Sequence, residues 1–326
     1  MPTKLDRLVV FGDSMSDIGN KRESGMGRIA RMLGAMRTNE VGRFSDSRNW
    51  VDFIWEWAGG ATLLDTDAQT SRAQTLKHRS LNQWSRYGTP PACGFSYANY
   101  SEGGAMGASD RFGMGLGTFK AQQKAFLEHW KMHRTNGHTL FLVWFGLNDL
   151  VTNGRNKEKM KSVAVEMCTL CEDIYNKDPN SHFIFANIPN PQGAVRYMGK
   201  EETEKVRGFQ TGAFEFGYEL ARQVRIFPGG QASLVDMYTA MEHVNENLRA
   251  YGIKRGAQPK GMKVHYGKRT SLSSDDFFAT TSDEAHPTEV VYKVIAGIWA
   301  DEILRQFDLG ELRNCGEATF QIKNGA

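Results

Sequence analysis

Short apolar runs alternate along this chain with longer stretches in which apolar residues recur at helical spacing. The short runs predict buried strands, because they stop at turn residues and are too brief for helices. The longer stretches predict helices, since their apolar residues fall every three or four positions. The expected strands cover residues 7–13, 95–101, 139–146, 182–189 and 232–238. The expected helices cover residues 48–57, 117–131, 156–176, 199–225, 237–251 and 287–307.

Strands that alternate with helices in this way form parallel β-α-β units. We therefore expect an α/β fold, a three-layer α/β/α sandwich around a central, mainly parallel five-stranded sheet. The 326 residues are expected to form a single domain, 1–326, with long irregular excursions at about 59–95 and 253–282. Ligands of such sheets bind outside the carboxyl ends of the strands. Functional residues should therefore lie where strands end and loops begin.

Three of these strand ends, and one motif before the last helix, carry residues suited to nucleophilic catalysis. In chain order they are Ser14, Gly103 with Gly104, Asn148, and Asp283 with His286. A serine hydroxyl becomes a good nucleophile when a histidine takes its proton and a carboxylate orients that histidine. Glycine N–H groups and an asparagine amide can stabilise the anionic tetrahedral intermediate. Each motif alone is commonly a turn or a helix cap, but the four in this order indicate a serine hydrolase.

The same motifs resemble those of the GDSL, or SGNH, hydrolase family. GDS at 12–14, the glycine pair within NYSEGGA, GLND at 146–149 and DEAH at 283–286 match its four blocks. FGDSMSDIGN, GRFS, NWVDF and HPTE look like the lipase-like branch of the family, and the resemblance extends over residues 9–290. The chain has no G-x-S-x-G motif, which counts against the alternative of an α/β-hydrolase.

The resemblance implies the flavodoxin-like SGNH hydrolase fold and a role for each matched residue. Ser14 would be the nucleophile, His286 the general base and then the general acid, and Asp283 the group that orients His286. The implied oxyanion hole consists of the Ser14 N–H, the Gly104 N–H and the Asn148 side chain, with Gly103 as the alternate to Gly104. No metal and no organic cofactor is implied.

The resemblance also implies a carboxylic ester hydrolase that works through an acyl-enzyme on Ser14. Lipid esters are the expected substrates, so a lipase or phospholipase A is expected. Acyl transfer stays open, because another alcohol could take the acyl group from the same intermediate. A short-chain or carbohydrate acetyl esterase is the alternative. A non-catalytic binding protein on the same fold is disfavoured, because all the matched residues are present.

A methionine-rich stretch that follows Ser14 is the candidate for binding the substrate. Met26, Ile29, Leu33 and Met36 recur there at helical spacing, with arginines between them. Because methionine adapts to varied apolar ligands, the stretch could hold an acyl chain or rest on a membrane surface. An amphipathic segment packed on the core is the alternative reading.

The remaining features of the sequence exclude classes of protein. A net charge of +3 and the lack of a basic-aromatic motif do not favour a nucleic-acid partner. Four cysteines make no disulfide framework, and the pair Cys168 and Cys171 lies in a helical pattern, which disfavours a zinc or redox site. Without a recognisable signal peptide or transmembrane run, we expect a soluble protein, cytoplasmic or exported by a leaderless route. The sequence predicts no oligomeric state.

Overall fold

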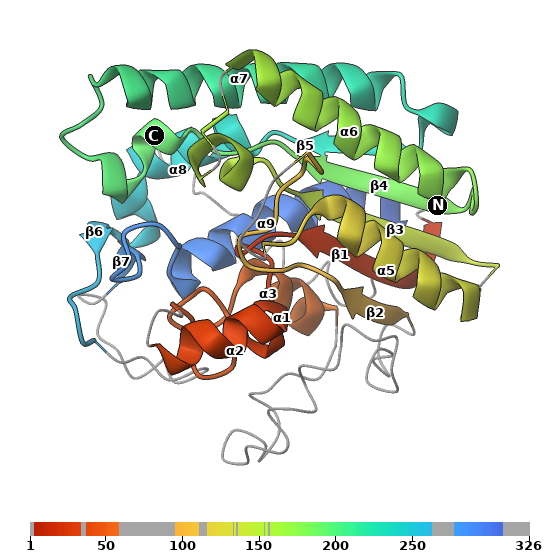
Figure 1. Cartoon of the computed structure of the whole chain (residues 1–326), viewed down its shortest axis with the longest axis horizontal. Helices are drawn as coiled ribbons and strands as arrows, with labels where there is room; N and C mark the ends of the chain where they lie inside the picture. The colour runs from red at the N-terminus through yellow and green to blue at the C-terminus, as the bar shows by residue number, and fades with distance from the viewer. Residues whose placement is uncertain are drawn as a thin grey trace.

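The structure is a computed structural model that describes residues 3–33, 37–58, 95–110, 116–132, 134, 136–152, 154–155, 157–262 and 277–308. Its main sheet has the strand order β2–β1–β3–β4–β5 (Figure 1), and a short strand β8 also pairs with β1. The strands are β1 (Thr3–Gly12), β2 (Ser96–Asn99), β3 (His138–Trp144), β4 (Ser181–Ala186), β5 (Ala232–Val235) and β8 (Phe307–Asp308). All the pairings in this sheet are parallel. The expected α/β fold with a central five-stranded sheet is therefore confirmed.

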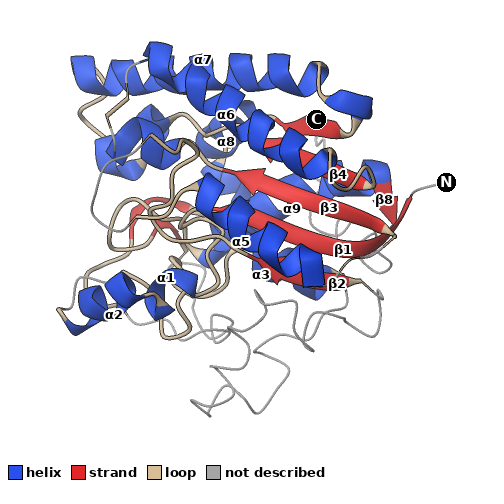
Figure 2. Cartoon of the chain, turned by 45° about the vertical axis from the view of Figure 1, so that its right-hand side comes forward, coloured by secondary structure: helices blue, strands red, loops and turns tan. Residues whose placement is uncertain are grey.

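Helices cover both faces of this sheet, which makes three layers (Figure 2). One face packs against α3 (Trp50–Trp57), α8 (Met237–Glu246) and α9 (Glu289–Gln306). The other packs against α5 (Phe119–Met132), α6 (Lys157–Tyr175) and α7 (Glu204–Arg225). Along β1, Leu8 and Val10 point toward the helices α3, α8 and α9. Val9 and Phe11 point toward the helices on the opposite face. Strands buried on both faces explain why the sequence shows continuous apolar runs rather than alternation.

Shorter elements connect these layers. They are the helices α1 (Asn20–Glu23) and α2 (Gly25–Met32), the π-helix η3 (Asn148–Thr152) and the 3₁₀ turns η4 (Pro191–Gly193), η5 (Val195–Tyr197), η6 (Pro228–Gly230) and η7 (Leu248–Tyr251). Within the described part of the chain, no helix has the length and apolar character needed to span a membrane.

Several expected boundaries need correction. The helix expected from residue 199 begins at Glu204, because Thr203 caps it and Gly199 has a left-handed φ of 73°. The last helix begins at Glu289 rather than at Pro287. The excursion at 253–282 is not wholly irregular, since β6 (Lys254–Ala257) and β7 (Phe278–Thr280) form a two-stranded parallel sheet. The excursion at 59–95 lies outside the described residues except for its last residue.

The register of the sheet brings three of the candidate loops to one edge. Val10 of β1 pairs with Asn99 of β2, and Gly12 pairs with Trp144 of β3. Since the strands are parallel, the residues that follow them leave the sheet on the same side. Ser14, the glycine pair and Asn148 all follow these strands, so they meet at the edge where the topology predicts a ligand.

Candidate active site

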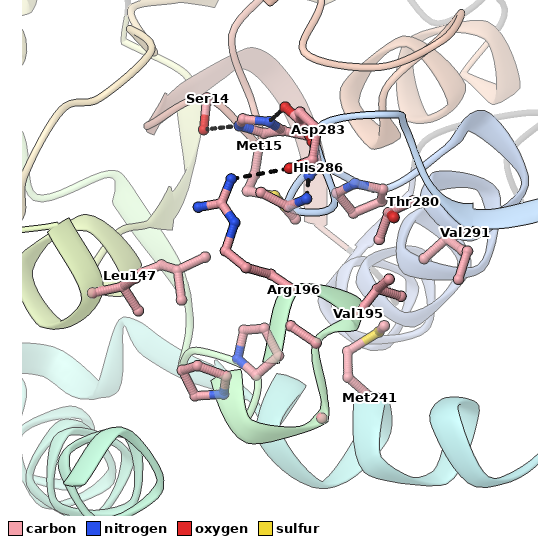
Figure 3. Close-up of a pocket in the computed structure, with 18 of the residues that line it drawn as sticks. Ser14, Met15, Leu147, Val195, Arg196, Met241, Thr280, Asp283, His286 and Val291 are labelled. Carbon is pink, nitrogen blue, oxygen red and sulfur yellow. Dashed lines mark hydrogen bonds and ion pairs between the residues drawn. The ribbon is translucent and has the colours of Figure 1, made fainter. Parts of the chain in front are cut away.

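Ser14, His286 and Asp283 form a hydrogen-bonded chain at this edge (Figure 3). His286 Nε2 lies 2.9 Å from Ser14 Oγ, and His286 Nδ1 lies 2.6 Å from Asp283 Oδ2. The two ring nitrogens therefore face a hydroxyl on one side and a carboxylate on the other. This arrangement lets the imidazole accept the proton of Ser14 while Asp283 holds its Nδ1–H.

A tight turn gives Asp283 and His286 their geometry. Asp283 Oδ1 accepts hydrogen bonds from Thr281 Oγ1 and from the N–H groups of Ala285 and His286, each at 2.9 Å. Glu284 has a φ of 63° and is the one residue other than glycine at positive φ in the described ranges. Burial acts to raise the pKa of Asp283, but the hydrogen bonds and charge of His286 hold it well below its usual range. Asp283 is thus the charged partner of the imidazole.

The end of β1 presents Ser14 through a second set of hydrogen bonds. Gln122 of α5 donates to the carbonyl of Gly12 and accepts from its N–H, so β1 stops there without unpaired backbone groups. Asp13 Oδ1 then accepts the Met15 N–H at 2.9 Å and closes the turn around Ser14. Ser14 itself is buried, beneath the pocket that leads to it.

Asp17 joins this turn to the loop after β2. Its Oδ1 accepts the N–H groups of Gly19 and Asn20, and its Oδ2 accepts those of Lys21 and Gly103. Burial raises the pKa of Asp17 to about 6, against the effect of these four N–H groups. Asp17 therefore orders the turn that follows Ser14.

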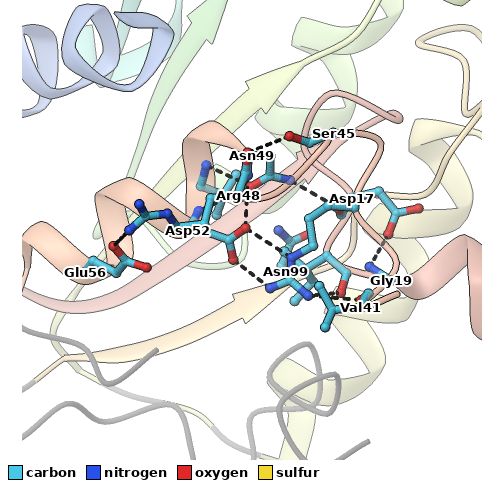
Figure 4. Close-up of polar contacts among 12 residues, drawn as sticks. Asp17, Gly19, Val41, Ser45, Arg48, Asn49, Asp52, Glu56 and Asn99 are labelled. Atoms are coloured by element: carbon cyan, nitrogen blue, oxygen red, sulfur yellow. Dashed lines mark hydrogen bonds and ion pairs between the residues drawn. The ribbon is translucent and has the colours of Figure 1, made fainter. Parts of the chain in front are cut away.

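A buried polar network supports the turn from below (Figure 4). Asn49 donates to the carbonyl of Asp17 and caps α3 in a capping box with Asp52. Arg43 forms a two-pronged ion pair with Asp52, at 3.0 and 2.6 Å, and also donates to the carbonyl of Ile18. The GRFS and NWVDF motifs therefore act as a scaffold beneath the loop that carries Ser14.

The structure distinguishes between the two glycines proposed for the oxyanion hole. The Gly103 N–H already donates to Asp17 Oδ2 at 2.8 Å. Among the described residues, the N–H groups of Ser14 and Gly104 have no hydrogen-bond acceptor. Gly104 also has a φ of 79°, which favours glycine. The geometry therefore favours Gly104 over Gly103 as the donor beside Ser14.

Asn148 lines the same pocket but is already hydrogen-bonded there. Its Nδ2 donates to Asp13 Oδ2 at 3.2 Å and to the carbonyl of Ala105 at 3.1 Å. The next residue, Asp149, accepts the N–H groups of Gly107 and Ala108 and thereby anchors the loop after β2. Asn148 could meet an oxyanion only by giving up or sharing one of its present acceptors.

A pocket of about 270 Å³ opens beside Ser14 and His286. Its wall comes mainly from the loop after β4, from α8 and from α9. Its apolar lining residues include Trp144, Leu147, Val151, Pro189, Pro191, Val195, Met241, Leu248, Val291 and Ile295. The sequence patterns did not predict this wall. The one available signal was the loop after β4, where apolar residues follow a strand end.

The expected substrate-binding stretch lies elsewhere. None of Met26, Ile29 and Leu33 lines the pocket, and their exposed fractions are 48%, 52% and 77%. The reading of an acyl-chain site therefore needs correction, because these side chains point to solvent. The alternative of packing on the core is also wrong for them. Met36 lies outside the described residues.

The described residues contain no group of three His, Cys, Asp or Glu side chains that could hold a metal ion. Cys168 and Cys171 are buried side by side on α6 with free thiols. Burial raises the pKa of Cys168 to about 12, so this thiol stays protonated at neutral pH. The pair is therefore part of the packing of α6 against the sheet.

The sequence matches a known protein family. The family model described as GDSL-like Lipase/Acylhydrolase matches residues 8–299. A curated relative, the thermolabile hemolysin of Vibrio parahaemolyticus, is 21% identical over 310 residues, which are 90% of this chain and 63% of that protein. The chain therefore spans less than two thirds of that relative.

Solved structures that resemble the chain have low sequence identity. One is an acetylxylan esterase from Geobacillus stearothermophilus, 14% identical with a TM-score of 0.44, covering 95% of this chain and 98% of that one. Another is a putative GDSL-like lipase from Parabacteroides merdae, also 14% identical, with a TM-score of 0.42 and coverage of 93% and 97%.

Proposed function

The chain belongs to the GDSL-like lipase/acylhydrolase family of serine ester hydrolases, and we propose that it hydrolyses lipid esters through an acyl-enzyme on Ser14. The observation that carries this proposal is the apolar pocket that opens directly beside the Ser14–His286 pair. A chain of methylene groups gains free energy when it leaves water for such a pocket, at roughly 0.8 kcal/mol for each CH₂. An acetyl group would leave most of this wall unused.

In the proposed reaction, Ser14 Oγ attacks the ester carbonyl while His286 Nε2 takes its proton. Asp283 stabilises the resulting imidazolium through the short bond to Nδ1. The N–H groups of Ser14 and Gly104 bind the oxyanion. His286 then gives the proton to the leaving alcohol, and a water activated by the same nitrogen releases the acyl group. An alcohol in place of that water would receive the acyl group, so hydrolysis and acyl transfer use the same residues.

Contact with a lipid surface is the second part of the proposal, and it rests on α2. Met26, Ile29 and Met32 of α2, and Leu33 directly after it, are between 48% and 85% exposed, an unusual set of apolar side chains for so short a segment. Arg28 is exposed on the same helix and suits anionic lipids. Figure 2 shows α2 on the side to which the main strands point, and Arg37, shortly after it, lines the pocket. A lipid surface under α2 would therefore lie near the pocket mouth.

The test of the esterase is release of p-nitrophenol from esters of increasing acyl length. We expect turnover that rises from acetyl to medium or long chains, and a loss of roughly 10⁴-fold or more in Ser14→Ala. Ser162→Ala, at an exposed position of α6, is the matched control and should keep full activity. A preference for acetyl esters would contradict the lipid assignment. Activity retained in Ser14→Ala would contradict the mechanism.

The test of the lipid surface is sedimentation with vesicles that contain anionic phospholipid. Replacing Met32 and Leu33 by serine should reduce the bound fraction severalfold and leave hydrolysis of a soluble ester unchanged. Phe214→Ser is the matched control, because Phe214 is 60% exposed on α7 at another face. Equal loss of binding in the control, or no loss in the α2 variant, would count against α2.

A further inference from the structure

Arg196 extends into the pocket from η5, opposite Ser14 (Figure 3). Its Nη2 donates to the carbonyl of Asp283 at 3.0 Å, and its backbone N–H donates to the carbonyl of Glu284 at 3.2 Å. η5 is thus joined to the turn that carries Asp283 and His286.

The charge of Arg196 has no carboxylate counterpart among the described residues. Its hydrogen bond to the Asp283 turn goes to a backbone carbonyl. The carboxylate of Asp283 itself accepts hydrogen bonds from His286, Ala285 and Thr281. A guanidinium has five N–H donors, and these contacts use few of them. A cation with spare donors beside an apolar wall is suited to an anion that arrives with the substrate.

A second cation lies on the same rim. A polar hollow adjoins the active-site pocket, and the two share only Arg37, Arg196 and Asp283 as lining residues. Arg37 is exposed, and Lys260 lines the hollow from the segment after β6. An ester whose acyl chain occupies the apolar pocket would have its alcohol part on the side of His286, which gives the proton to the leaving alcohol. The two arginines therefore lie at the junction through which a polar alcohol part could leave the pocket.

We propose that Arg196, assisted by Arg37, binds a phosphate group on the alcohol part of the ester. The substrate class is then lipid esters that carry a phosphate, in preference to neutral glycerides. This inference rests on the proposed function, because it places a second group of the same substrate. Arg196 would be a specificity-determining residue, since it would contact the substrate but take no part in proton transfer.

The test compares two substrates with the same acyl chains, dioctanoyl phosphatidylglycerol and dioctanoylglycerol. In Arg196→Gln we expect kcat/KM for the phospholipid to fall about 10- to 100-fold further than kcat/KM for the glyceride, the range for a hydrogen bond to a charged group. Arg37→Gln should lower the ratio of kcat/KM for the phospholipid to kcat/KM for the glyceride as well, but by a smaller factor. Arg196→Lys keeps the charge and should restore part of the ratio. Arg207→Gln, on an exposed face of α7, is the control and should not change the ratio.

Several outcomes would overturn the inference. An equal fall on both substrates in Arg196→Gln, with no rescue by lysine, would mean that Arg196 only braces the Asp283 turn. Inhibition by inorganic phosphate that Arg196→Gln abolishes, without any change in the substrate ratio, would assign the site to a free anion. If Arg196→Gln hydrolyses both lipids with the same ratio of kcat/KM values as the unaltered protein, this inference fails and the proposed function stands. Failure of the unaltered protein to hydrolyse either lipid, with turnover of short esters, would defeat the proposed function instead.

Discussion

His286 Nε2 lies 2.9 Å from Ser14 Oγ although 272 positions separate the two residues in the chain. Ser14 stands at the end of β1, and His286 stands before α9, which packs on the same sheet. Phe44 lies against the His286 ring, with centroids 5.0 Å apart, and restricts its movement. The distance is therefore set by rigid elements, which is what proton transfer between the two groups requires.

Replacing Asp283 by asparagine should abolish most of the activity without unfolding the protein. The amide cannot balance an imidazolium and favours the wrong tautomer of His286, so kcat should fall by about 10⁴-fold. The measurement is steady-state hydrolysis of the best p-nitrophenyl ester beside circular dichroism. Asp173→Asn, at an exposed position of α6, should behave like the unaltered protein. A fall of less than tenfold would show that Asp283 is not the group that orients His286.

Asp13 should make the protein less stable as the pH rises from about 4 to about 7. Burial raises the pKa of this carboxyl from 3.8 to about 7, so the folded state keeps a proton that the unfolded state has lost. Stability falls with pH wherever the folded state binds more protons. Asp13→Asn removes this contribution. We therefore subtract the melting temperature of the unaltered protein from that of Asp13→Asn. This difference should be more positive at pH 8 than at pH 5. A difference that does not change between these pH values would contradict the shift.

Gly104→Ala should lose activity because the added methyl group meets two obstacles. The φ of 79° is unfavourable for alanine, and the new Cβ would lie 2.7 Å from Leu116 Cδ2. Relief of this contact would turn the Gly104 N–H away from Ser14, with an expected loss of about 10²-fold in kcat. Gly199→Ala has a similar φ of 73° and open space around its Cβ, so it tests backbone strain alone. Equal activity in the two variants would exclude Gly104 from the oxyanion hole.

Arg43→Met should destabilise the fold more than any exposed ion pair could. It leaves the buried carboxylate of Asp52 without its two-pronged partner, a loss of about 3–5 kcal/mol in unfolding free energy. Arg305→Met breaks an exposed pair with Glu302 and should cost at most about 1 kcal/mol. Urea unfolding of the two variants gives the comparison. Similar midpoints would show that the Arg43–Asp52 pair adds little.

The sequence predicted the sheet well because its strands are buried on both faces. Such strands appear as unbroken apolar runs that stop at turn residues, as β3 does before Gly146. The motifs at the strand ends then predicted which side chains meet. The short strands β6 and β7 escaped prediction, because Lys254 and Arg255 are exposed and show no apolar pattern.

Other features depend on contacts that no local pattern reveals. The choice between Gly103 and Gly104 follows from Asp17, which lies 86 positions away and takes the Gly103 N–H. The pocket wall joins Val195 to Met241 and Ile295, which belong to three separate elements. The sequence pattern of α2 did not reveal whether its apolar face is exposed or buried, since apolar residues at helical spacing are typical of both.

Thr3 of β1 pairs with Phe307 of β8, so a hydrogen-bonded strand pair provides a second connection between Ser14 and His286. From Ser14 this route runs back along β1, crosses to β8 and returns along α9 to His286. A linker from Phe307 to Thr3, together with new termini in an exposed loop elsewhere, would give a circular permutant. In this permutant His286, the base, would precede Ser14, the nucleophile, in the sequence. Such a permutant would hold both groups on one short polypeptide segment. The order of the two catalytic residues along such a chain would depend on where its termini are placed. The sheet would keep Ser14 and His286 adjacent in either order.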